Sequence, residues 1–148
     1  MEINGLPLHP LVVHAAVIAG PVAALTAILY VVLPSWRDRL RWPMLALAFV
    51  ATASIWVAFL TGQDFRDSKD FFTQGPLADK VDKHAGLAGT LRWVTSGFFV
   101  AALLSAWWHT RGGAVRVLLG VLLAAGAVAT LVYVVLTGDA GARAVWGE

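Results

Sequence analysis

Cysteine is missing from this sequence altogether, and charged residues occupy only 14% of its 148 positions. Without thiols the sequence has no disulfides, no thiolate catalysis, no iron–sulfur cluster and no cysteine-ligated zinc. Soluble domains carry about a quarter charged residues, so the shortage of charge argues against a soluble fold. The net charge of +2 is no electrostatic footprint for a phosphate backbone, and we therefore exclude nucleic acid as a partner.

In place of charge, hydrophobic residues make up 59% of the sequence and gather in four runs. Each run approaches the ~20 residues that a helix needs to cross a bilayer. Pro34 and Pro43 bracket the first loop, and tryptophans stand at several run ends, as is typical of membrane interfaces. The sequence therefore predicts one all-α domain over residues 1–148, a bundle of four transmembrane helices. We expect the spans at about 10–33, 43–61, 84–108 and 114–137.

Basic residues differ in their surroundings between the two sides of this bundle. On one side they lie in the short loops between paired spans, with Asp38 as the only acid, whereas on the other they are mixed with aspartates. Short basic loops favour the cytoplasm. We therefore expect both termini and the loop 62–83 on the outer face of the cytoplasmic membrane. Because Glu2 precedes the first run and no basic n-region does, we interpret that run as a retained span.

A repeated pattern relates the first pair of spans to the second. His14 is followed by alanine near the start of one span, and Leu-Thr-Gly closes the next span at residues 60–62. His84 and the Leu-Thr-Gly at 136–138 repeat this order. Chance is the alternative, because alanine, glycine and leucine are abundant here. The pattern predicts two similar helical hairpins related by an axis along the membrane normal, with the closing glycines ending their helices.

His14 and His84 are the candidate axial ligands of a haem b. Helices one and three of an up-and-down bundle are diagonal, so imidazoles on them can meet across the centre. The spacing of Leu77, Val81 and Ala88 around His84 places that histidine on an apolar helix face. Small residues beside both histidines leave room for a flat group. The alternative is close helix packing, with each histidine bonded to a carbonyl or water.

Three arginines are candidates to bind the haem propionates. Arg92 leads because it lies within a span, where an unpaired charge is costly. Arg66 and Arg143 follow the two Leu-Thr-Gly closures, and we expect Asp64 and Asp139 to cap turns there or to pair with them. The alternative for all three arginines is snorkelling to lipid phosphate.

The other two histidines are assigned different roles. His9 precedes Pro10, which favours an extended or capping backbone, so we expect a cap or a supporting partner of the cofactor rather than a ligand. His109 lies in the opposite loop beside Arg111, and we expect it to be solvated. Without cysteine or a Glu-x-x-His pattern, zinc and di-iron sites have little support.

The opening segment at residues 5–14, Gly-Leu-Pro-Leu-His-Pro-Leu-Val-Val-His, resembles a bacterial family of four-span membrane proteins, the domain of unknown function two-two-three-one. Its members open with His-Pro-Leu-x-Val-His and carry a second histidine at the head of helix three, matching His84. A Thr-Gly-x-x-Gly ending matches residues 137–141. The chain departs where the family's Phe-Pro is Ala15-Ala16. The resemblance implies a four-span fold over the whole chain, and cytochrome-c-like neighbours in some members imply electron transfer.

These observations predict a cytochrome-b-like membrane protein that exchanges electrons with a quinol or an exported redox protein. Iron with two histidine ligands is closed to substrate, so we expect electron transfer rather than a self-contained enzyme. The alternative is a cofactor-free accessory or scaffold subunit, in a homo-oligomer or a larger complex. A transporter is more distant, because it would need broken helices and more intramembrane polar groups.

Overall fold

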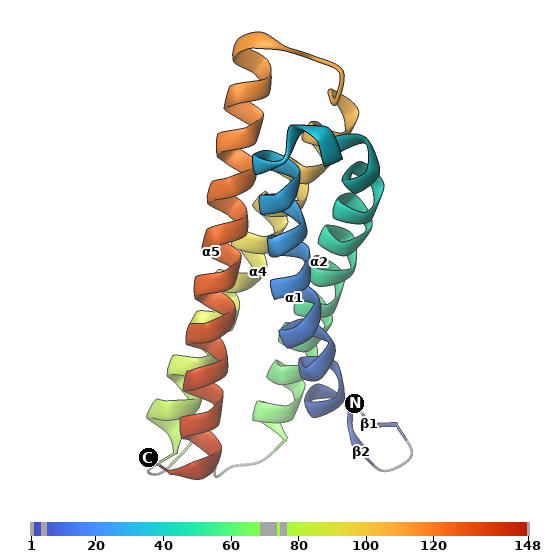
Figure 1. Ribbon diagram of the computed structural model, residues 1–148. Coiled ribbons are helices and arrows are strands. Elements are labelled where there is room, and N and C mark those ends of the chain that lie inside the picture. Colours follow the sequence, from blue (N-terminus) through green and yellow to red (C-terminus); the bar gives the residue numbers. More distant parts are fainter. Residues whose placement is uncertain (1, 4–5, 69–73, 75–76, 148) are drawn as a thin grey trace.

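The computed structural model describes residues 2–3, 6–68, 74 and 77–147, and Figure 1 shows its long helices running side by side. In chain order the elements are β1 (Glu2–Ile3), β2 (Leu6–Pro7), α1 (Leu8–Val32), the 3-10 helix η1 (Pro34–Trp36), α2 (Arg37–Asp67), α4 (Ala78–Trp107) and α5 (Gly113–Trp146). The strands β1 and β2 are two residues each and pair antiparallel.

The four long helices form an up-and-down bundle. α1 packs against α2 and α5, and α4 packs against the same two helices, so α1 and α4 lie on a diagonal. Figure 1 shows the start of α1 and the end of α5 at the same end of the bundle as the end of α2 and the start of α4. The predicted all-α bundle of two similar hairpins, α1–α2 and α4–α5, is confirmed.

Small residues fill the contacts between these helices, and large apolar side chains cover much of the outside. A Cβ on Gly126 would lie 3.1 Å from the Phe98 Cα, so α4 and α5 approach closely there. Each of the four helices is long and apolar enough to cross a membrane. This distribution suits a bundle surrounded by lipid, and the protein is membrane-embedded. Buried alanines of the core include Ala23, Ala24, Ala27, Ala48, Ala51, Ala102 and Ala127, and exposed apolar residues include Ile18, Leu25, Phe49, Val121 and Val135.

The helices extend beyond the predicted spans, and three expectations about their ends are wrong. Pro43 lies inside α2 rather than in the first loop, and Gly62 and Gly138 lie inside α2 and α5 rather than ending them. Charged residues form helix readily, so a helix can continue past the hydrophobic run that crosses the membrane. The run therefore indicates the membrane-spanning part of the helix and not where the helix begins or ends. The first and last parts of the expected loop 62–83 therefore belong to α2 and α4. Within the remainder, residues 69–73 and 75–76 lie outside the described residues.

Candidate cofactor site at a pair of histidines

Two histidines from diagonal helices meet near the end of the bundle that holds the chain termini. The ring centroids of His9, in the first turn of α1, and His84, in the second turn of α4, are 6.4 Å apart. Their planes are inclined by 75°. Both residues are half-buried. The bundle thus brings together two imidazoles that are far apart in the sequence.

Each imidazole is held by a backbone carbonyl of a neighbouring helix. His9 Nδ1 lies 2.9 Å from the Ala58 carbonyl oxygen on α2, and His84 Nδ1 lies 2.9 Å from the Thr137 carbonyl oxygen on α5. A carbonyl oxygen only accepts, so Nδ1 carries the proton in both rings. In the neutral imidazole this leaves the Nε2 lone pair available. A backbone carbonyl on the other ring nitrogen is the arrangement that orients metal-binding histidines in proteins.

A glycine one helical turn after each carbonyl provides room for the ring. A Cβ on Gly62 would lie 2.8 Å from His9 Cε1, and a Cβ on Gly141 would lie 3.0 Å from His84 Cε1. The first separation is shorter than real Cβ contacts and the second is at the short end of their range, so a larger residue at either position would shift the imidazole. The two hairpins therefore contribute the same unit: a histidine, a carbonyl from the following helix, and a glycine against the ring.

This unit changes how the two halves of the sequence correspond. His9, rather than His14, is the structural counterpart of His84, and Gly141, rather than Gly138, is the counterpart of Gly62. The sequence missed this because matching by letter pairs His14 with His84 and Gly62 with Gly138, whereas the ring contacts involve His9 and Gly141. The glycines at positions 62 and 141, which lie inside long helices, were the sequence signal that could have identified these ring contacts.

Both rings face a cavity of about 420 Å³ that is lined mainly by apolar and small residues. This volume is within the range typical of ligand sites. A smaller cavity of about 60 Å³ shares His9, His84 and Ala88 with it. Thr137 lines the smaller cavity, and its Oγ1 is buried without a hydrogen-bond partner. Val81 and Ala88 line the large cavity, which confirms that His84 lies on the apolar face of its helix.

His14 also lines the large cavity but has different surroundings. It is exposed, and its Nδ1 lies 2.6 Å from the Pro10 carbonyl oxygen of the preceding turn. The histidine in ring contact with His84 is His9. The expectation that His9 stands in extended or capping backbone before the helix is wrong: α1 begins at Leu8, so His9 belongs to its first turn.

Arg92 is surrounded by aromatic rings. Its guanidinium carbon lies 3.9 Å from the ring centroid of Phe59, 5.0 Å from that of Trp56 and 5.4 Å from that of Trp93. Cation–π attraction therefore compensates this charge within the bundle. Among the described residues that line the large cavity, Phe59 is present and Arg92 is not. Any influence of Arg92 on the cavity would act through the Phe59 ring.

The other two candidate arginines differ in their position relative to the cavity. Arg66 lines it, and Arg66 Nη2 lies 2.5 Å from Asp82 Oδ1. Arg143 is not among the described lining residues, and its Nε lies 2.9 Å from Asp139 Oδ2 in the same helix. The expected pairing of Asp139 with Arg143 is confirmed. Arg66 alone of the three arginines is placed at the rim of the cavity.

His109 is not solvated, contrary to expectation. Its side chain is only 11% exposed, and its ring bridges Tyr30 and Asp38 at the other end of the bundle. The position of His109 in a loop suggested exposure, but Tyr30 of α1 and Asp38 of α2 contact its ring nitrogens. Within the described part of the chain, no group of three or more histidines, aspartates or glutamates could hold a metal ion.

The fold and the histidine pair define a four-helix membrane protein with a candidate cofactor cavity near one end. The model of a family described as predicted membrane proteins, DUF2231, matches residues 5–148, and the chain belongs to this family. No curated protein and no solved structure matches the chain.

Proposed function

We propose that the protein binds one haem b between His9 and His84 and uses it to transfer electrons. The observation that carries this proposal is the pair of imidazoles, held by carbonyls through Nδ1 and free at Nε2, beside a cavity of about 420 Å³. His9 takes the place that the sequence suggested for His14.

The distance between the two rings would allow both imidazoles to hold one metal ion between them. With metal–nitrogen bonds of about 2.0 Å, two such imidazoles have ring centroids roughly 6 Å apart. The 6.4 Å between the His9 and His84 centroids is close to this value. Two imidazoles cannot complete a tetrahedral site, and the described residues offer no third ligand of that kind. A porphyrin brings four ligands of its own, so a two-histidine donor set favours haem over a bare metal.

Residues around the pair can be assigned to haem binding. Gly62 and Gly141 keep the imidazoles close to the helices, and Thr137 Oγ1 has an unused hydrogen-bonding capacity. Arg66 lies at the cavity and can bind a propionate, at the cost of its ion pair with Asp82. These groups orient the cofactor and compensate its negative charge.

A haem with two axial imidazoles supplies one-electron chemistry and leaves no open position for a substrate. Electron transfer therefore fits this site better than catalysis. A quinol in the membrane or an exported redox protein is the proposed partner. The proposed orientation, with the termini and histidine pair on the outer side of the cytoplasmic membrane, would place the haem within reach of an exported protein.

Titration of the purified protein with haemin tests the proposal. We expect a sharp Soret band that saturates at one haem per chain, and α and β bands after reduction with dithionite. A titration that shows only the spectrum of free haemin in detergent would contradict it. That result would favour the alternative of a cofactor-free scaffold subunit, in which the small residues serve helix packing and assembly alone.

A further inference from the structure

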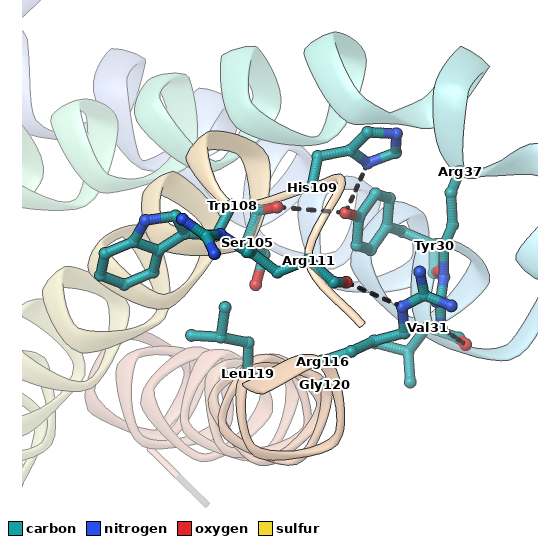
Figure 2. A pocket seen from close by; sticks show the side chains of 10 residues that line it. All are labelled: Tyr30, Val31, Arg37, Ser105, Trp108, His109, Arg111, Arg116, Leu119 and Gly120. Carbon is teal, nitrogen blue, oxygen red and sulfur yellow. Dashed lines mark hydrogen bonds between the residues drawn. The ribbon is translucent and has the colours of Figure 1, made fainter. Parts of the chain in front are cut away.

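A second polar cluster lies at the opposite end of the bundle, and Figure 2 shows the residues that line the cavity beside it. The Tyr30 hydroxyl donates a hydrogen bond to the Ser105 carbonyl oxygen at 3.2 Å and lies 3.0 Å from His109 Nδ1. His109 Nε2 lies 2.6 Å from Asp38 Oδ1. These contacts connect the ends of α1 and α4 to the first turn of α2, so they fix the walls of a shallow cavity between the helix ends.

Three arginine side chains line this cavity. Arg37 donates hydrogen bonds at 3.0 and 2.9 Å to two carbonyls at the end of α1, and Arg116 Nε donates to the Arg111 carbonyl oxygen at 3.1 Å. These acceptors are neutral. Among the described residues none of the three arginines has a carboxylate partner, and the nearby Asp38 pairs with His109. The cavity therefore carries positive charge that the described chain does not neutralise.

Ser105 provides an independent sign of a ligand. It lines the same cavity and is 4% exposed, and its Oγ is buried without a hydrogen-bond partner. A buried hydroxyl without a partner is costly, so another group is expected to satisfy it. The cavity, of about 20 Å³, has room for one water-sized group. One oxygen atom of a larger anion would fill that space while the rest of the anion stayed at the rim.

We propose that this cavity binds the phosphate group of an anionic phospholipid. One phosphate oxygen accepts a hydrogen bond from Ser105 Oγ, and the guanidinium groups of Arg37, Arg111 and Arg116 surround the remaining oxygens. Arginine matches phosphate because its planar donors bind two oxygens at once. The cavity lies where membrane helices end and beside Trp108, which is the depth of lipid headgroups. This location favours a lipid phosphate over a free one.

Reconstitution into vesicles of phosphatidylcholine, with and without phosphatidylglycerol, tests the site. We expect phosphatidylglycerol to raise the thermal unfolding midpoint of the unmodified protein, and native mass spectrometry to show retained phosphatidylglycerol. Arg111→Gln should remove most of this stabilisation and retention. Arg39→Gln is the matched control, because Arg39 belongs to the same end of the bundle and is exposed like Arg111, but lies outside the described cavity lining. It should behave like the unmodified protein.

Ser105→Ala is a second variant, because it removes the unpartnered hydroxyl without changing charge. It should also weaken phosphatidylglycerol retention. Equal losses in Arg111→Gln and Arg39→Gln would show diffuse attraction to basic loops and overturn the proposal. Stabilisation by inorganic phosphate in pure phosphatidylcholine, to the same extent as by phosphatidylglycerol, would overturn the assignment to a lipid.

Discussion

The ring centroids of His9 and His84 lie 6.4 Å apart across the bundle, although the two residues belong to diagonal helices and to different hairpins. Each ring is hydrogen-bonded through Nδ1 to a carbonyl of the next helix in the chain. The carbonyl is that of Ala58 for His9 and that of Thr137 for His84. The pair is therefore a product of both hairpins. Neither hairpin alone could provide it.

Substitution of the glycines beside the rings tests whether they position the imidazoles. Gly62→Ala and Gly141→Ala should each destabilise the protein by about 1–3 kcal/mol, because the added carbon would collide with a histidine. Both should also weaken haem binding. Thermal unfolding in detergent and haemin titration measure the two effects.

Gly86→Ala is the control for these variants, since a Cβ there would meet nothing within 4 Å. Alanine is the better helix former, so this variant should be unchanged or more stable by up to about 1 kcal/mol. If Gly62→Ala and Gly141→Ala behave like Gly86→Ala in both measurements, the rings are not held where the structure places them.

The four-helix fold was predictable because its signal is compositional. Hydrophobic runs of bilayer length specify membrane helices whatever their neighbours, and all four runs form helices. Helix ends were less predictable. The residues from Gln63 to Asp67 and from Gly138 to Trp146 continue as helix, because polar residues and isolated glycines do not by themselves stop one.

The candidate site was predictable only in part. The helical stripe around His84 predicted that Val81, His84 and Ala88 share one helix face, and all three line the large cavity, because the information lies within one helix. The partner could not be found in this way, since His9 is held by Ala58, a residue of another helix whose carbonyl carries no sequence signal. Proline after His9 suggested a cap, whereas Pro10 fits the first turn of α1.

Arg92 offers a test that separates structural from cofactor roles. Arg92→Gln should lower stability by about 1–2 kcal/mol through the loss of the contacts with Phe59, Trp56 and Trp93. Its haem spectrum and affinity should stay close to those of the unmodified protein. A large loss of haem affinity with unchanged stability would instead support the propionate role that the sequence suggested.

A comparison of Arg66 and Arg143 variants tests which arginine binds a haem propionate. Arg66→Gln should lower haem affinity severalfold, because a charge-assisted hydrogen bond contributes about 1.5–3 kcal/mol before the loss of the Asp82 ion pair is counted. Arg143→Gln should leave the affinity unchanged, since Arg143 lies outside the described cavity lining. Isothermal or spectrophotometric haemin titration distinguishes them.

Asp82→Asn completes this comparison. It removes the partner that competes for Arg66, so haem affinity should be maintained or increased. Stability should change little, because ion pairs with exposed side chains contribute about 0–1 kcal/mol. Equal haem affinities in Arg66→Gln and Arg143→Gln would remove Arg66 from the site.

The most direct test is the reduced-minus-oxidised visible spectrum of three histidine variants loaded with haem. His9→Ala and His84→Ala should each lose the bis-imidazole spectrum, whereas His14→Ala should retain it, because His14 is exposed and bonded only within its own helix. Loss of the spectrum in His14→Ala and His84→Ala, with His9→Ala unaffected, would contradict the His9–His84 assignment. A spectrum that survives all three substitutions would place the haem outside this cavity.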